Sequence, residues 1–341
     1  MEEIESVGLT QEEVFSALWR IAREINKVVV GQEWLIQSLL TGLFSEIPYT
    51  FKQDEKVKTG YGHVLLEGVP GLAKTLTVMT LANTINAKFQ RIQFTPDLMP
   101  ADIIGTRIFD ARLGAFRTEK GPIFAHLILA DEINRAPQKS QSALLEAMQE
   151  RQVTVGETTY PLEEPFWILA TQNPIEQEGV YSLPEAQVDR FALNVEVGYP
   201  SAAEETAMLG LKLAEIQVNR VIDSADVIRF RRFIAGTYVS DAILEYIVRI
   251  VQSSRNHGPA SLTVVREMVL YGASPRAAQH LLALARTTAF LRGRDYVLPA
   301  DVKRIAPGAL RHRVIRTVRA EAEGVTADEI IAEILAKIPL P

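Results

Sequence analysis

An eight-residue stretch predicts most of this fold: Gly68-Val69-Pro70-Gly71-Leu72-Ala73-Lys74-Thr75. The largely apolar residues 63–67 before it predict a strand, and the helical spacing of apolar residues at 76–82 predicts a helix after it. A glycine-rich turn between a strand and a helix directs backbone N–H groups and the positive end of the helix dipole at one point, where a phosphate can bind. We therefore interpret the stretch as a P-loop, although a chance turn before a helix would show the same local pattern.

Two side chains of this loop have the chemistry that nucleotide binding requires. Lys74 can reach the β- and γ-phosphates of a nucleotide, and the Thr75 hydroxyl can ligate Mg²⁺. The second glycine of the general pattern G-x-x-x-x-G-K-[ST] is replaced by Ala73. We expect Ala73 to adopt a helical φ, with Gly71 supplying the flexibility of the loop.

The composition is that of an ordinary globular protein. The chain has 341 residues, 47% hydrophobic and 23% charged, which is enough for two domains. It has no cysteine, which excludes disulfides and thiolate metal sites. No apolar run reaches the roughly 18 residues of a membrane helix, so we expect a cytoplasmic protein without membrane insertion. The net charge of -6 argues against nucleic acid as the main partner.

A second strong pattern is a buried strand that ends in two carboxylates. Residues 126–130 are largely apolar and are followed directly by Asp131 and Glu132. At the carboxyl edge of an open α/β sheet, Asp131 can hold Mg²⁺ through its water shell, and Glu132 can polarise the water that attacks the γ-phosphate. The alternative is that the pair caps the next helical segment.

A third buried strand, at residues 165–171, ends in uncharged amides. It is followed by Gln172-Asn173-Pro174, where Asn173 can orient the attacking water without competing as a base. An asparagine before proline is also a common turn. With strands at 63–67, 89–94 and 192–197, the pattern predicts a five-stranded parallel sheet.

Two β-hairpins are predicted within this α/β part. One lies at residues 105–124 around Arg112-Leu113-Gly114, and the other pairs residues 152–155 with 158–160. Either could be an edge hairpin that merely packs. A polar surface loop is expected at residues 48–60. Helices are expected at residues 10–25, where Thr10 and Glu13 form a capping box, and at 33–44, 97–104, 138–149 and 183–191.

The β pattern stops at Tyr199-Pro200-Ser201, so we expect an α/β domain of residues 1–200 and a smaller, all-helical domain of residues 201–341. In the second domain Arg276 occupies the first turn of a helix, where a cation opposes the helix dipole. A bound anion would explain it, which makes Arg276 a candidate to touch nucleotide phosphates; the alternative is a solvated arginine. Helices are predicted at residues 204–216, 226–235, 241–254, 275–292, 299–306 and 328–337.

Together these features resemble an AAA+ ATPase and, more narrowly, the MoxR family. The similarity extends over residues 30–312, and Ala73 in the loop is usual in that family. The segments that carry the resemblance are the P-loop, Asp131-Glu132-Ile133-Asn134-Arg135-Ala136-Pro137, Ala170-Thr171-Gln172-Asn173-Pro174, residues 183–191 and Gly272-Ala273-Ser274-Pro275-Arg276-Ala277.

The resemblance implies ATP and Mg²⁺ as cofactors. It implies Walker B at Asp131 and Glu132, sensor 1 at Asn173, an arginine finger at Arg190 and sensor 2 at Arg276. Residues 28–32 would face adenine, although core packing explains that apolar run equally well. The implied nucleotide contacts are Val30, Gln32, Gly68, Val69, Pro70, Gly71, Leu72, Ala73, Lys74, Thr75 and Leu76, with Thr75 and Asp131 at the metal.

The resemblance also implies partners. It implies a hexameric ring, in which the two hairpins would match segments that line a central pore in related rings. It also implies chaperone-like action on metalloenzymes or multi-subunit complexes. A von Willebrand factor A domain protein often serves as adaptor. Arg190 would then act on the nucleotide of a neighbouring subunit, whereas a surface salt bridge with Asp189 is the structural alternative.

Three functions are consistent with these sequence features. ATP-driven remodelling of a protein client is the first, and a nucleic-acid-dependent AAA+ motor is the second, although the acidic balance disfavours it. The third is a GTP-dependent switch, which is disfavoured because the chain has no base-reading Asn-Lys-x-Asp.

Overall fold

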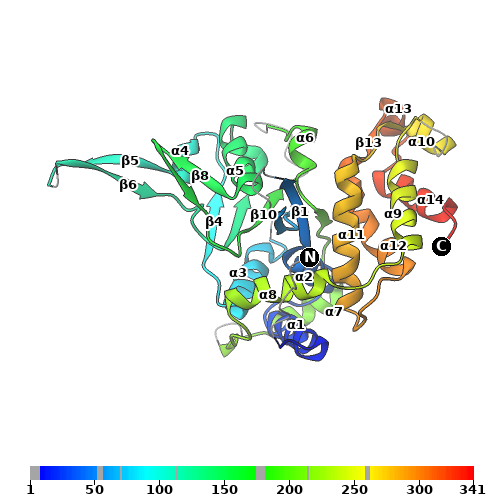
Figure 1. Cartoon of the computed structure of the whole chain (residues 1–341), viewed down its shortest axis with the longest axis horizontal. Helices are drawn as coiled ribbons and strands as arrows, with labels where there is room; N and C mark the ends of the chain where they lie inside the picture. The colour runs from blue at the N-terminus through cyan, green and yellow to red at the C-terminus, as the bar shows by residue number, and fades with distance from the viewer. Residues whose placement is uncertain are drawn as a thin grey trace.

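The fold is seen in a computed structural model that describes residues 8–51, 57–69, 71–112, 114–173, 181–212, 215–257 and 262–341. Pro70, Leu113 and Pro174, which belong to predicted motifs, lie outside the described residues. A parallel sheet with its helices and hairpins forms one side of the molecule, and the helices from α9 to α14 form the other (Figure 1).

Five parallel strands form the sheet, as predicted. Their order is β11-β3-β10-β7-β4, so the P-loop strand and the Asp-Glu strand flank the strand that leads to Asn173. All carboxyl ends therefore meet at one edge. The bounds are β3 (Val64–Glu67), β4 (Phe89–Gln93), β7 (Leu127–Asp131), β10 (Trp167–Gln172) and β11 (Leu193–Glu196).

The apolar run of β7 is buried because helices cover both faces of the sheet. Leu127 and Leu129 belong to a core shared with α3 (Lys74–Thr84), whereas Ile128 and Ala130 belong to a second core with α5 (Gln138–Glu150). Alternate side chains of a strand point to opposite faces, so a strand covered on both sides needs apolar residues at every position.

Two N-terminal helices precede the sheet, as predicted. In α1 (Gln11–Asn26) the Thr10 side chain and the Glu13 carboxylate form the expected capping box, and α2 (Glu33–Phe44) follows. The predicted surface loop at residues 48–60 is wrong, because β1 (Glu46–Phe51) and β2 (Val57–Tyr61) pair antiparallel. Buried Ile47 and Tyr61 hold this ribbon against the core. This tertiary contact cannot be predicted from the polar sequence of the segment.

Both predicted hairpins are present. The first, β5 (Gly105–Asp110) and β6 (Ala115–Lys120), extends away from the sheet, as Figure 1 shows at the far left. The second pairs β8 (Gln152–Val155) with β9 (Thr158–Pro161). The short helical segments of this part are α4 (Pro100–Ile104), η1 (Ile133–Arg135) and α6 (Glu185–Val188), with α4 and α6 shorter than predicted.

The C-terminal part is helical, as predicted, but not wholly so. A ribbon of β12 (Val269–Tyr271) and β13 (Ile315–Arg316) pairs antiparallel, and its strands are too short for the sequence to reveal. The helical segments are α7 (Ala202–Leu209), α8 (Ser224–Ala235), α9 (Asp241–Ser253), α10 (Thr263–Met268), α11 (Pro275–Phe290), α12 (Pro299–Leu310), η3 (Arg311–Arg313), α13 (Val318–Ala322) and α14 (Ala327–Lys337).

One buried core joins the two parts. It contains residues of α1 and α2, one face of the sheet, and the helices α8 to α12 and α14. The boundary between residues 200 and 201 stays a prediction. None of the helices in the described ranges combines the length and the apolar character that crossing a membrane requires.

Trp167, at the start of β10, supports the strand that carries the polar tip. It is fully buried, and its Nε1 donates a hydrogen bond of 2.8 Å to the Gly62 carbonyl. We expect Trp167→Ala to lower the free energy of unfolding by about 3–5 kcal/mol, measured by denaturant unfolding followed by circular dichroism. Trp19→Ala, at a side chain that is 59% exposed, is the control and should change it by less than about 0.5 kcal/mol. Equal effects of the two substitutions would contradict this assignment.

Candidate functional site

The P-loop turns through two residues with positive φ. Gly71 has φ 89°, as its expected flexibility requires, and Ala73 has φ 54° and ψ 15°. The prediction of a helical φ at Ala73 is therefore wrong: the residue is left-handed, which costs a non-glycine residue roughly 1–2 kcal/mol. Its carbonyl accepts hydrogen bonds from the backbone N–H and the hydroxyl of Thr77, both at 2.9 Å, which hold the strained turn onto α3.

Gly68 is required by close packing rather than by its backbone angles. A Cβ at this position would meet the Val197 carbonyl oxygen, just after β11, at 2.7 Å. Any larger residue would therefore displace the start of the loop from the sheet edge.

A cavity of about 420 Å³ lies between this loop and the strand ends. It brings together the loop, the Asp-Glu pair of β7 and the amides after β10, which come from three distant parts of the sequence. The predicted site residues that line it are Gly68, Gly71, Leu72, Ala73, Lys74, Thr75, Leu76, Asp131, Glu132 and Asn173. Val69 instead packs against the core.

Lys74 is held inside the loop. Its Nζ donates a hydrogen bond of 2.7 Å to the Gly68 carbonyl. Burial lowers the pKa of Lys74, and the carboxylates of Asp131 and Glu132 oppose that shift. The ammonium therefore stands between the loop and the acidic strand end, where phosphate charge would be neutralised.

Thr171 binds both members of the acidic pair. Its hydroxyl donates to Asp131 Oδ1 at 2.6 Å and accepts from the Glu132 N–H at 2.8 Å. Glu132 has φ 56°, so the chain turns sharply between the two carboxylates. The role of Thr171 was not predicted from the sequence, because it depends on β10 lying directly beside β7.

Two side chains of β4 also bind the pair, and the sequence analysis missed both. Arg91 donates to Asp131 Oδ2 from Nε at 3.0 Å and from Nη2 at 2.6 Å. Gln93 donates to Glu132 Oε2 at 2.7 Å. The alternation of β4 shows that these residues share a face, but only the parallel register of β4 with β7 places them at the acidic residues.

The donor set fits Mg²⁺. Thr75 and Asp131 offer the hard oxygen ligands that this ion prefers, and it is usually held by one or two protein oxygens together with phosphates and water. Within the described ranges there is no group of three His, Cys, Asp or Glu residues that could hold a metal alone. Arg91 Nη2 lies 2.6 Å from Asp131 Oδ2 and would be a neighbouring cation to an ion held there.

A smaller cleft of about 90 Å³ adjoins the phosphate cavity and shares several loop residues with it. Val30 and Gln32, both predicted to face the base, line it together with Met208 of α7 and Leu211. Gln32 Nε2 donates to the Gly198 carbonyl at 3.2 Å. An apolar cleft next to a phosphate site suits a flat base, and the part played by α7 was not predicted.

Arg190 and Arg276 do not line the phosphate cavity of their own chain. Arg190 Nη1 donates to the Leu145 carbonyl on α5 at 2.8 Å, and Arg276 Nη1 donates to Asp189 Oδ2 at 3.3 Å. Their roles as arginine finger and sensor 2 stay predictions. The arginine-finger role of Arg190 requires a second subunit, and the sensor 2 role of Arg276 requires its side chain to move.

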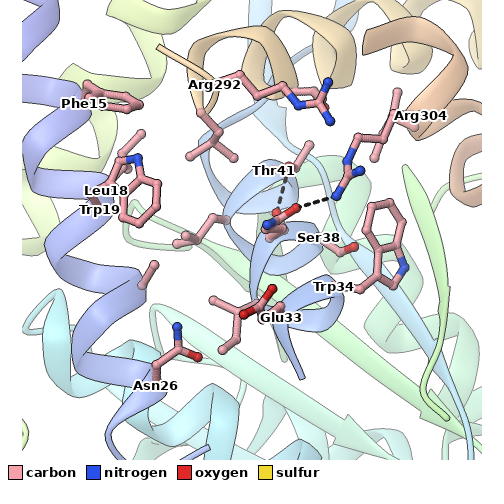
Figure 2. A pocket seen from close by; sticks show the side chains of 17 residues that line it. Phe15, Leu18, Trp19, Asn26, Glu33, Trp34, Ser38, Thr41, Arg292 and Arg304 are labelled. Atoms are coloured by element: carbon pink, nitrogen blue, oxygen red, sulfur yellow. Dashed lines mark hydrogen bonds between the residues drawn. The ribbon is translucent and has the colours of Figure 1, made fainter. Parts of the chain in front are cut away.

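A separate cleft of about 470 Å³ lies between α1, α2, α11 and α12. Figure 2 shows Phe15 and Trp19 of α1 on one side of it and Trp34 and Arg304 on the other. Among the described residues that line it there is no glycine-rich loop, and Glu33 is the one carboxylate. The cleft is thus unrelated to the phosphate chemistry.

Known families and proteins match this architecture. The family described as "ATPase family associated with various cellular activities (AAA)" matches residues 63–193, and the AAA lid domain matches residues 261–334. A crystal structure from Cytophaga hutchinsonii, described as an ATPase, superposes with a TM-score of 0.86 at 44% identity and covers 97% of each chain.

Several relatives match over nearly the whole chain, and two of them are more than 40% identical to it. Chaperone MoxR1 of Mycobacterium tuberculosis is 45% identical over 95% of this chain and 82% of its own length, and YeaC of Bacillus subtilis is 41% identical over 97% of both. The chain belongs to the MoxR family of AAA+ ATPases and hydrolyses ATP.

Proposed function

We propose that this protein couples the hydrolysis of Mg²⁺-bound ATP to chaperone-like remodelling of protein complexes. The observation that carries the proposal is the cavity in which Lys74 and Thr75 face Asp131 and Glu132, with Asn173 at its rim. The name of the mycobacterial relative, a chaperone, supports the remodelling role. Maturation of a multi-subunit complex or insertion of a metal cofactor would be the finer form of this activity.

Each side chain has a separate task in hydrolysis. Lys74 neutralises charge on the β- and γ-phosphates, and Thr75 with Asp131 would hold Mg²⁺, which supplies further charge stabilisation when bound. Asn173 orients a water molecule, and Glu132 accepts its proton as the water oxygen attacks the γ-phosphorus and ADP leaves.

Glu132 is restrained before it can act as a base. Its Oε2 accepts hydrogen bonds from Gln93 at 2.7 Å and from Arg135 at 2.9 Å. Both bonds fix the position of this carboxylate beside the cavity.

We also propose a hexameric ring in the cytoplasm, in which Arg190 completes the site of the next subunit. Its position outside its own cavity supports this arrangement. A protein client would contact the projecting β5–β6 hairpin, where Phe109 and Phe116 are 58% and 61% exposed. A von Willebrand factor A domain protein would serve as adaptor.

A nucleic-acid-dependent motor is the second candidate. The same hairpin carries Arg107, Arg117 and Lys120 beside its exposed aromatic rings, a combination found in single-strand binding surfaces. The overall charge of -6 disfavours it. Salt-sensitive binding of single-stranded DNA, measured by fluorescence anisotropy, would favour the motor, whereas its absence favours a protein client.

Lys74→Ala should abolish measurable ATP binding. The ammonium makes charge-assisted contacts to two phosphates, each worth about 1.5–3 kcal/mol, so affinity should fall by about 100-fold or more in calorimetry. Lys139→Ala, at an exposed position of α5, is the control and should bind normally. If Lys74→Ala bound ATP with wild-type affinity, the assignment of the P-loop would be contradicted.

Glu132→Gln should bind ATP with near wild-type affinity and hydrolyse it slowly. Loss of the base should lower kcat by about 10²–10⁴-fold, measured as phosphate release. Glu163→Gln, whose side chain is 89% exposed, is the matched control. If Glu132→Gln turned over at the wild-type rate, the base would lie elsewhere.

Arg190→Ala and Lys74→Ala should each be inactive alone and should regain part of their ATPase activity when mixed. In a mixed ring an intact Arg190 can face an intact P-loop, and such an arginine is worth roughly 10³–10⁵ in rate. Native mass spectrometry would establish that the rings are mixed. Inactive mixed rings, or normal hydrolysis by Arg190→Ala alone, would overturn the shared site.

A further inference from the structure

The backbone that carries Arg190 is held by two side chains of the lid. His312 Nε2 lies 3.1 Å from the Phe191 carbonyl oxygen, and Arg313 makes the larger set of contacts. Arg313, in η3, donates to the carbonyl oxygens of Asp189 at 2.9 Å, Phe191 at 2.6 Å and Ala192 at 3.5 Å. Its Nε donates to Asp189 Oδ1 at 2.7 Å. These bonds hold the backbone directly before Arg190, at Asp189, and directly after it, at Phe191 and Ala192.

The interior environment makes this link rigid. Arg313 is 5% exposed, and a buried cation requires both a counter-ion and acceptors for its five N–H groups. Asp189 is the counter-ion, and further acceptors are the Ala309 carbonyl and His280 Nδ1, the latter at 2.8 Å. Burial lowers the pKa of His280 well below its usual value, so the neutral ring can accept this bond.

The first turn of α11 binds the same carboxylate. Ser274 Oγ donates to Asp189 at 3.2 Å, and Arg276 Nη1 donates to it at 3.3 Å. Asp189 therefore joins two lid segments, α11 and η3, to the short helix before Arg190. A displacement of the lid relative to the sheet has to strain or break these bonds.

We propose that Asp189 and Arg313 are positioning residues for Arg190, through which the lid of one subunit sets the arginine that acts on the nucleotide of its neighbour. The inference rests on the proposed shared site. It adds a physical connection between the nucleotide sites of two neighbouring subunits. When the lid moves around its own nucleotide, the segment that carries Arg190 moves with it. Hydrolysis in the next subunit then depends on the nucleotide state of the first.

Two substitutions test this link. Asp189→Asn keeps the side-chain shape and removes the counter-ion, and Arg313→Lys keeps the charge but cannot reach all three carbonyls. The matched control is Arg311→Lys in the same short helix, because Arg311 pairs with Asp328 of α14 at 2.6 Å and with Glu196 of β11 at 3.6 Å instead. Thermal unfolding would show which proteins are folded.

We expect both variants to bind ATP with wild-type affinity and to hydrolyse it about 100-fold more slowly, because displacing an aligned group by about 1 Å costs that much. Arg311→Lys should keep its activity. Mixed with Lys74→Ala, each slow variant should recover activity as Arg190→Ala does, because the Lys74→Ala subunit supplies a correctly placed arginine. Should Asp189→Asn fail to fold, Arg313→Lys provides the same readouts.

A purely structural role would give a different result, namely weaker ATP binding or slow hydrolysis that mixing does not restore. Either that result or wild-type hydrolysis by both variants would overturn the inference, if the mixture of Arg190→Ala with Lys74→Ala still recovers ATPase activity. If the Arg190→Ala mixture itself stays inactive in mixed rings, the shared site fails and the inference fails with it.

Discussion

The parallel pairing of β10 with β3 on one side and with β7 on the other is the constraint on which the site depends. It places the P-loop, the Asp-Glu pair and the amides after β10 at one sheet edge, although they are separated by dozens of residues in the chain. The register then sets individual contacts: Ala170 pairs with Ala130, so the next residue, Thr171, binds both Asp131 and Glu132. Parallel strands can be paired in this way only because helices cover both faces of the sheet.

Charge compensation is the second organising feature of this edge. Two adjacent carboxylates would repel each other and the phosphates, and each is matched by a cationic or amide donor. Arg91 binds Asp131, Gln93 and Arg135 bind Glu132, and Lys74 stands opposite both. Nucleotide and Mg²⁺ would therefore enter a cavity whose carboxylates already have donors.

The lid is part of the same cooperative structure. A single buried core includes the N-terminal helices, one face of the sheet and the lid helices. Polar contacts also attach the lid to the α/β part at particular residues. The main one is Asp189, which binds residues of α11 and η3. Movement of the lid therefore reaches the neighbourhood of Arg190 through specific bonds rather than through general packing.

The sequence by itself determined the five strands, the P-loop, the two hairpins and the family. These features are local: apolar runs, turn residues and the spacing of Lys74 or Asp131 are visible in short windows. The tertiary structure alone decided what depends on contact between distant segments. It placed Arg91 at Asp131, turned the polar residues 48–60 into a ribbon, and bound Asp189 to Arg313 of the lid. Register and lid docking are set by packing over the whole core, which no local pattern encodes.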